Sequence, residues 1–312
     1  MNAYYATDFV LNLPAGHRFP MEKYALLRDA IAAEHPGVHL SLAPAATDGQ
    51  LAMVHTPDYI DRVSHGGLSV AAQREIGFPW SPQMSERARR SVGASIAAAR
   101  DAMQQGIAAN MAGGTHHAYA DKGAGFCVFN DMAVTARVLQ SDWLQTRGPR
   151  GRPMAVAIVD LDVHQGNGTA HLFSRDETVF TLSVHGEKNF PFRKEASDLD
   201  LALPDGTGDD RYLETVETGL RRLSERFAPD LVLYLAGADI HEGDRLGRLK
   251  VTDAGMRARD LMVFSWAKAR GLPLAFAMAG GYGRDIATTV AVQVQTFAIA
   301  TSLQRDWQVT IS

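Results

Sequence analysis

The stretch Met154-Ala-Val-Ala-Ile-Val-Asp160-Leu-Asp162-Val-His164-Gln-Gly-Asn167-Gly168 holds an apolar run that passes directly into a cluster of polar residues. The run is continuous, rich in β-branched residues and closed by an aspartate, as expected for a strand that is buried on both faces. Such strands belong to parallel sheets that are covered by helices on both sides. In these sheets ligands bind beyond the carboxyl ends of the strands, which is where the polar cluster lies.

Similar apolar runs recur along the chain, and helical segments lie between them. At Ser81-Pro82, for example, the serine would cap a helix and the proline would occupy its first turn. The alternation predicts an α/β fold with three layers, α/β/α, and a mostly parallel central sheet. Expected strands are residues 2–9, 107–112, 154–159, 179–184, 231–236 and 274–279; expected helices are 81–105, 130–139, 209–226, 252–268 and 285–303. The polar stretch 146–153 is a surface connection too short to separate domains, so we expect one domain over residues 1–312.

Composition narrows the classes of protein and of site. The chain has 312 residues and a formal net charge of −4, which gives no reason to expect binding to nucleic acid or to an anionic membrane. Cys127 is the only cysteine, so an intramolecular disulfide is excluded and any metal must be held mainly by histidine and carboxylate. We find neither a leader peptide nor an apolar run long enough to cross a bilayer, and expect a cytoplasmic protein of undetermined oligomeric state.

Five of the expected strands are each followed immediately by a cluster of polar residues, and all five clusters should meet at one edge of the sheet. They are residues 113–119 with the pair His116-His117, 160–168, Ser183-Val-His185-Gly186, Gly237-Ala-Asp239 and Gly280-Gly281-Tyr282-Gly283. Neither Gly113-Gly114 nor Gly280-Gly281 fits a phosphate-binding sequence pattern, so nucleotide binding is not expected. This gathering of histidine, aspartate, glycine and tyrosine predicts a catalytic site.

Asp162, His164 and Asp239 are the candidate metal ligands. Asp162 and His164 are two residues apart, so their side chains point the same way on an extended strand end, and Asp239 arrives from another strand. Two carboxylates and one imidazole leave a position for water, as catalytic zinc sites require. A lone Asp-x-His is more often a hydrogen-bonded pair; the convergence of loops favours a metal here.

His116, His117 and Tyr282 are the candidate catalytic groups. Adjacent histidines are mostly surface or packing residues, but beside a metal they suit general acid and base work because their pKa lies near neutrality. Asp160 and Asn167 are available to orient them through the far ring nitrogen. Tyr282 could be a turn-capping aromatic, or its hydroxyl could stabilise an oxyanion.

At these motifs the sequence closely resembles histone deacetylases and their bacterial relatives. Residues 113–119, 160–168, Gly123-Ala-Gly125-Phe126-Cys127, Ser183-Val-His185, Gly237-Ala-Asp239 and Gly280-Gly-Tyr282 stand in the family's order and spacing, over essentially the whole chain. The segments 77–82 and 89–93 look most like the class IV branch. The resemblance implies an arginase-like α/β/α fold and a zinc-dependent hydrolase that removes acetyl or longer acyl groups from lysine side chains of proteins or peptides.

The resemblance also implies a role for individual residues. Asp162, His164 and Asp239 match the zinc ligands, His117 the base, His116 an electrostatic or acid partner, and Tyr282 the group that polarises the substrate carbonyl. The Gly125 carbonyl would accept a hydrogen bond from the substrate, Phe126 would form one wall of the acyl-lysine channel, and Phe192 or Phe190 the other. Arg18 resembles an arginine beside an internal exit channel. Asp160, Asp162, His164, Ser183 and Val184 match a structural site for K⁺ or Na⁺, largely through carbonyls.

The sequence departs from the family's pattern at one residue and leaves the choice of substrate open. Asn167 stands where class I members carry an aspartate, and an amide can orient His117 without raising its pKa by charge. Asp244, His241 and Arg245 are expected to border the entrance, where the substrate is chosen. Small acylated amines such as acetylpolyamines are the alternative substrate, favoured by a narrow or acidic entrance, and a non-catalytic scaffold that binds acyl-lysine is the more distant alternative.

Overall fold

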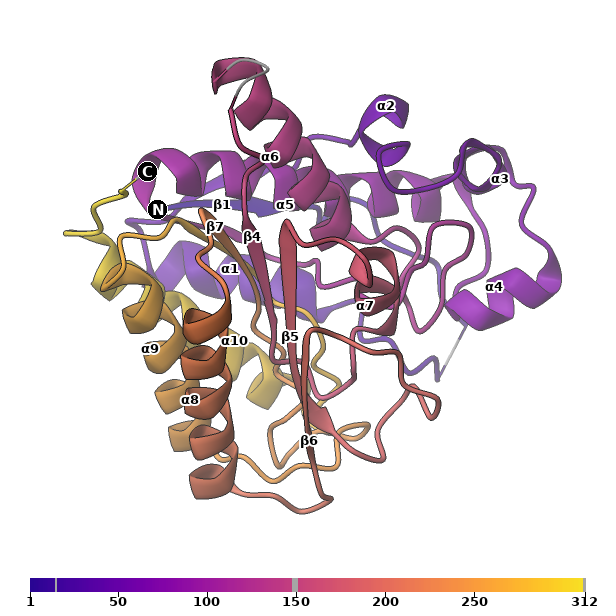
Figure 1. Cartoon of the computed structure of the whole chain (residues 1–312). Helices are drawn as coiled ribbons and strands as arrows, with labels where there is room; N and C mark the ends of the chain where they lie inside the picture. The colour runs from indigo at the N-terminus through magenta and orange to yellow at the C-terminus, as the bar shows by residue number, and fades with distance from the viewer. Residues whose placement is uncertain (15, 148–150, 311–312) are drawn as a thin grey trace.

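One sheet of eight parallel strands runs through the centre of the protein (Figure 1). The computed structural model describes residues 1–14, 16–147 and 151–310. The strand order is β2-β1-β3-β8-β7-β4-β5-β6, and every neighbouring pair is parallel. The strands are β1 Asn2–Tyr5, β2 His39–Leu42, β3 Ile107–Asn110, β4 Val156–Asp160, β5 Val179–Gly186, β6 Leu199–Leu203, β7 Leu231–Leu235 and β8 Leu274–Ala277. The predicted fold class is confirmed, with a sheet that is parallel throughout the described residues.

Helices cover both faces of the sheet, which gives the expected three layers. In Figure 1, α8, α9 and α10 lie to one side of the strands, and α5 and α6 lie to the other. The helices are α1 Lys23–Glu34, α2 Asp48–Leu51, α3 Pro57–His65, α4 Val70–Ile76, α5 Pro82–Gln105, α6 Asp131–Arg147, α7 Asn167–Phe173, α8 Asp209–Arg226, α9 Asp253–Lys268 and α10 Ile286–Gln304. Two apolar cores result, one on each face.

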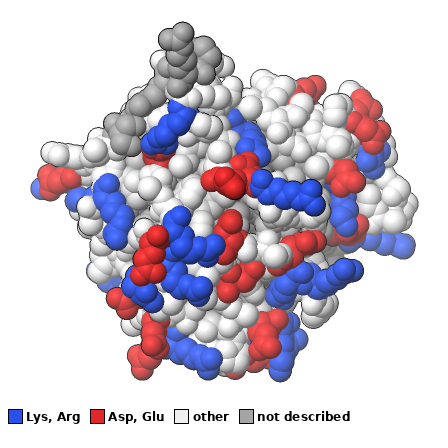
Figure 2. Space-filling view, in the orientation of Figure 1, with Lys and Arg blue, Asp and Glu red and all other residues white. Residues whose placement is uncertain are grey.

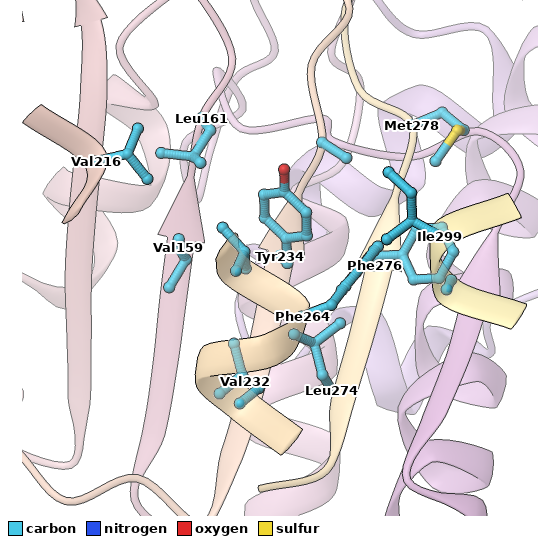
Figure 3. Close-up of a cluster of buried hydrophobic side chains, with 14 of the residues drawn as sticks. Val159, Leu161, Val216, Val232, Tyr234, Phe264, Leu274, Phe276, Met278 and Ile299 are labelled. Atoms are coloured by element: carbon cyan, nitrogen blue, oxygen red, sulfur yellow. The ribbon is translucent and has the colours of Figure 1, made fainter. Parts of the chain in front are cut away.

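β4 shows why a doubly covered strand has an uninterrupted apolar sequence. Ala157 and Val159 belong to the core beneath α8, α9 and α10, whereas Val156 and Ile158 belong to the core beneath α5 and α6. Successive residues of a strand point to opposite faces, so both sets must be apolar. Figure 3 shows the first of these cores, in which Val159 lies near Val232 and Tyr234 of the neighbouring strand β7.

Most elements with a strong sequence signal form where they were expected. Ser81 caps α5 by accepting a hydrogen bond from the Met84 N–H at 3.1 Å, and α8 has the predicted bounds. α6 is longer than expected and continues to Arg147; part of the predicted connection 146–153 lies outside the described residues. α10 is long and apolar enough to cross a bilayer by composition, which was not expected, but its buried side chains pack into the core against α1 and α9.

Both described ends of the chain lie at the amino edge of the sheet, where the strands begin. Asn2 opens β1, and the Trp307 indole N–H donates to the Leu272 carbonyl at 3.0 Å, just before β8. The Thr310 N–H donates to the Gly271 carbonyl at 2.9 Å in the same region. In Figure 1 the described ends, residues 1 and 310, lie on the same side of the molecule.

Candidate active site

The polar loops after the central strands line one cavity of about 590 Å³. β3, β8, β7 and β4 are consecutive in the sheet, so the loops that leave their carboxyl ends are neighbours in space although they are distant in the chain. His116 and His117 follow β3, Tyr282 follows β8, and His164 follows β4; all four line the cavity. Four of the five predicted clusters therefore converge, since Asp239 of the loop after β7 lies beside His164. The fifth, residues 183–186, lies within β5 and does not line the cavity.

Asp162, His164 and Asp239 form a compact cluster at the base of this cavity. Each offers one ligand atom, and the three atoms lie within 4.8 Å of one another. His164 Nδ1 is 2.9 Å from Asp162 Oδ1 and 3.2 Å from Asp239 Oδ2. A Cβ at residue 280 would overlap the carboxylate of Asp239, so only glycine allows the loop after β8 to pass this close.

The chemistry of this cluster fits a divalent metal. The remaining carboxylate oxygens are held by backbone groups: Gly280 N–H donates to Asp162 Oδ2 at 2.8 Å, and Val163 N–H donates to Asp239 Oδ1 at 2.9 Å. Asp239 Oδ2 is buried without a hydrogen-bond donor among the described residues. Burial and the neighbouring charge of Asp162 raise the pKa of Asp239 to about 7. Two buried carboxylates this close need a cation, and an imidazole with two carboxylates is a donor set that zinc accepts.

The tandem histidines have different partners and opposite protonation preferences. His116 Nδ1 is 2.6 Å from Asp160 Oδ2, whereas His117 Nδ1 is 2.7 Å from Asn167 Oδ1. Burial opposes the charge of His116, but the carboxylates of Asp160 and Asp162 outweigh it and raise its pKa to about 9. Burial, together with the nearby His116 and His164, holds the pKa of His117 well below its ordinary value. One histidine is therefore cationic and the other neutral at pH 7.

Tyr282 is fixed through its backbone, while its hydroxyl has no hydrogen-bond partner among residues 1–14, 16–147 and 151–310. Its N–H donates to Asp244 Oδ2 at 2.6 Å, and its carbonyl accepts from Arg245 Nε at 3.0 Å. The ring centre lies 6.5 Å from that of His164, one of the three candidate metal ligands. Burial, followed by the nearby charge of Asp162, raises the pKa of Tyr282 well above its ordinary value, so the phenol keeps its proton and can donate it.

Two aromatic side chains flank the approach to the histidines. Phe126 has a positive φ of 67°, which turns its ring into a cluster with Phe19 and Tyr282 along one wall. On the other side the ring centre of Phe190 lies 4.9 Å from that of His117, edge to face. Phe192, the other residue predicted for this wall, lines the cavity but is 85% exposed. Phe190 is thus the better candidate for the second wall, with Gly125 between the two.

The remaining predicted site residues take varied positions. Asp160, Ser183 and Val184 are buried in the carboxyl-terminal parts of β4 and β5, close to the candidate metal ligands, and a K⁺ or Na⁺ site there stays a prediction. Arg18 lines the cavity but is exposed; the buried cation that lines it is Arg87 of α5.

Of the three residues expected at the entrance, one is exposed at the cavity and two are buried. Arg245 is exposed and lines the cavity. The His241 side chain is buried, lies 3.1 Å from Asp253, and does not line the cavity described here. Asp244 is turned inward and accepts hydrogen bonds from three backbone N–H groups, those of Leu246, Gly247 and Tyr282.

Several supporting residues were not identified by the sequence analysis. Asp131, at the start of α6, accepts from the N–H groups of Gly114 and Thr115 and so holds the loop that precedes the histidines. Lys23 of α1 is 1% exposed, and its Nζ donates to the Gly281 carbonyl at 3.1 Å beneath Tyr282. Asn110 in β3 and Asp131 are both polar residues inside apolar surroundings, which is the signal that could have marked them.

Comparison with known proteins places the chain in a family. A family model described as the histone deacetylase domain matches residues 17–297. An uncharacterized protein of Picosynechococcus sp. is 44% identical over 286 residues, 90% of this chain and 92% of that protein. Histone deacetylase 2 of Arabidopsis thaliana is 33% identical over 258 residues, 80% of this chain and 64% of that protein.

The fold agrees with these matches. The crystal structure of a histone deacetylase homologue from Aquifex aeolicus superposes with a TM-score of 0.76 at 23% identity, covering 98% of this chain and 88% of that one. At that identity the likeness shows the fold alone. Because the family model spans most of the chain and a named relative exceeds 30% identity over four fifths of it, the protein belongs to the histone deacetylase family of hydrolases.

Proposed function

We propose that the protein is a zinc-dependent amide hydrolase that removes acyl groups from lysine side chains of peptides or proteins. One observation carries the proposal: the ligand cluster Asp162, His164 and Asp239 shares a single cavity with a neutral histidine, a cationic histidine and a tyrosine. Hydrolysis of an amide needs an activated water, stabilisation of an oxyanion and a proton for the leaving amine. These side chains supply all three.

Zinc is the metal we propose, because aspartate and histidine ligands with an open position are typical of its catalytic sites. When bound, it would polarise the acyl carbonyl and lower the pKa of a water molecule. The hydrogen bonds from Gly280 and Val163 orient both carboxylates before any metal arrives. A preorganised donor set of this kind favours binding without a large rearrangement.

His117 is the proposed general base. The Asn167 Oδ1 atom can only accept a hydrogen bond, so His117 Nδ1 must carry the proton and donate it. This tautomer leaves Nε2 with a free lone pair for a water proton. As the C–N bond of the amide breaks, the same nitrogen returns the proton to the leaving amine, so that the acid and the free amine are the products.

Tyr282 and His116 act on the charge that develops on the acyl oxygen. The Tyr282 phenol stays protonated and donates a hydrogen bond to this oxygen. His116 keeps its positive charge beside Asp160, and its ring centre lies 4.1 Å from that of His117. A positive charge fixed next to the base would favour the negative charge that develops in the cavity, and His116 would do so without itself transferring a proton.

The test is turnover of a fluorogenic lysine-peptide panel that carries acetyl, trifluoroacetyl and long fatty-acyl groups, alongside N-acetylated polyamines. We expect release from the peptides that is lost on chelation and restored by zinc. The Asp162→Ala variant should contain no metal and show no activity. Turnover that survives both chelation and this substitution would contradict the proposal. Turnover of polyamines but not of peptides would show that the substrate is a small acylated amine instead of acyl-lysine.

A further inference from the structure

The cavity opens through a rim of positive charge. Side chains that both line the cavity and are exposed must lie at its opening, and the positively charged ones are Arg18, Lys188, Arg245 and Arg248. We call these four residues the cationic rim. Among the described residues, Glu75 is the only exposed acid that lines the cavity. The rim departs from the whole chain, which has a formal net charge of −4.

Most of this positive charge is not neutralised by a neighbouring carboxylate. Arg248 lies 3.2 Å from Asp205, and Glu75 lies 3.2 Å from Lys122. No described carboxylate forms an ion pair with Arg18, Lys188 or Arg245. The contacts of Arg245 are backbone carbonyls, those of Tyr282 and Arg18.

The acid that could have balanced the rim is not available to a ligand. Asp244 is adjacent to Arg245 in the chain, but it is 4% exposed and its two carboxylate oxygens accept three backbone hydrogen bonds. A carboxylate held in this way stays with its N–H donors and is shielded from an incoming cation. The opening therefore offers positive charge at the surface and no exposed aspartate.

The cationic rim differs from the mixed charge seen on one face of the molecule. On the face drawn in Figure 2, lysine and arginine side chains alternate with aspartate and glutamate, so neither sign dominates. An opening lined by one sign of charge attracts the opposite charge and raises the rate of productive encounter. It also opposes a ligand of its own sign, which is a common source of specificity.

We infer that the cationic rim selects acyl-lysine peptides that carry aspartate or glutamate beside the acylated residue. The inference rests on the proposed function and names its substrate class. Once the acyl-lysine enters the cavity, the flanking residues of the peptide remain at the opening, within reach of Lys188 and Arg245. Polycationic amines, the alternative substrates, carry the same sign of charge as the rim and are disfavoured.

The experiment compares three peptides with one shared acyl-lysine and with acidic, neutral or basic flanking residues, together with acetylspermidine. In 50 mM salt we expect kcat/KM to be about tenfold higher for the acidic than for the basic peptide. In 0.5 M salt the ratio should fall to about twofold, because screening shortens the reach of exposed charges. A ratio of one, a ratio that favours the basic peptide, or faster turnover of acetylspermidine would overturn the inference.

Two charge reversals locate the effect. Lys188→Glu should lower the acidic-to-basic ratio about threefold, since it places a negative charge on the rim. The matched control is Arg175→Glu, an exposed position that follows α7 and precedes the amino end of β5, on the opposite edge of the sheet; the ratio should not change. Equal effects of the two variants would show that net charge, rather than the rim, sets the preference.

Binding separates this inference from the proposed function. Fluorescence anisotropy of the same three labelled peptides reports on the rim even without turnover. If no amide is hydrolysed by the zinc-loaded protein but the acidic peptide still binds most tightly, the proposed hydrolysis fails and the rim preference stands. If peptides are hydrolysed without any charge preference, the proposed function stands and the rim inference fails.

Discussion

Asn167 determines the protonation of His117 through an uncharged hydrogen bond. The amide oxygen fixes the tautomer but adds no negative charge, so burial and the neighbouring histidines keep the pKa of His117 low. Replacing Asn167 with aspartate should raise that pKa by about one unit or more, because a carboxylate stabilises the imidazolium. His117 would then already be protonated, and inactive as a base, at a higher pH, so the acid limb of the kcat/KM profile should shift to higher pH. An acid limb that stays in place would exclude His117 as the base.

Tyr282 gives a second prediction at the level of one atom. Its hydroxyl has no hydrogen-bond partner in the described part of the chain, so removing it breaks no native hydrogen bond. Tyr282→Phe should lower kcat by the equivalent of ~2–4 kcal/mol while KM changes little, as expected for a donor that acts on the transition state. Steady-state kinetics on the best peptide of the panel measures this, and an unaltered kcat would remove Tyr282 from the mechanism.

Lys23 supports Tyr282 from beneath. Its Nζ donates to the Gly281 carbonyl at 3.1 Å and lies 5.3 Å from the centre of the Tyr282 ring. Lys23→Met removes both interactions, so we expect kcat to fall about tenfold with little change in KM, through misplacement of the phenol. Lys23→Arg should recover part of the loss because it restores a donor and a charge. A fall in kcat that is accompanied by a comparable rise in KM, or the absence of any rescue by arginine, would indicate a purely structural role for Lys23.

At the level of elements, interior strands were predictable and edge strands were not. β4 and β7 are covered on both faces, so their sequences are continuously apolar and stand out. β2 and β6 lie at the two ends of the sheet, where partly exposed positions admit polar residues such as His39, Ser41 and Asp200. Also missed from the sequence were five helices, α1, α2, α3, α4 and α7. α2, α3, α4 and α7 have little length over which a helical period can show, whereas α1 has 12 residues and was missed despite its length.

In the candidate site, too, some residues could be predicted from the sequence and others could not. Residues proposed to carry the chemistry follow buried strands directly and keep a recognisable spacing, as Asp162 and His164 do. Residues that support them come from distant segments and become meaningful only through a contact. Lys23 lies more than 250 residues from the loop it holds, and no local pattern records such a pairing. Phe190 and Phe192 lie two residues apart, so spacing alone could not decide which of them faces His117.

The junction between the loop after α2 and the start of α6 should respond to pH. His55 Nε2 accepts from the Asn130 N–H at 3.0 Å, so Nδ1 must donate to the Tyr119 carbonyl, also at 3.0 Å. Burial, which outweighs the backbone bonds, lowers the pKa of His55 to about 4. The unfolded chain, with its pKa of about 6.5, binds this proton first. Stability is therefore complete above pH 6.5 and is lost as the pH falls toward 4.

Urea unfolding measures this contribution. Between pH 7.5 and pH 5, His55 should account for about 2 kcal/mol of the loss in the free energy of unfolding. A His55→Gln variant keeps a donor and an acceptor without a titrating group, so it should lose about that much less than the native protein. His39→Gln, at an exposed position on β2, is the control and should follow the native protein. Identical pH dependence in all three proteins would refute the assignment.

At the scale of the whole molecule, the proposed metal joins loops that follow β4 and β7. Zinc that binds only the folded state adds stability by mass action, ~2.7 kcal/mol at a free concentration one hundred times Kd. Chelation should therefore lower Tm. Asp239→Asn should abolish this shift, and without metal the variant should melt at or above the native apo-protein, because it removes one of two repelling carboxylates. A chelator effect that persists in Asp239→Asn would place the metal elsewhere.

The two edges of the sheet have opposite practical value. Both described ends of the chain lie at the amino edge, while the cavity opens beyond the carboxyl edge. A tag or a covalent tether at either end would attach the molecule by the edge away from its opening. Molecules immobilised this way would stand on a sensor surface with their openings toward the flowing solution. A peptide library passed over such a layer would meet every cavity in the same orientation.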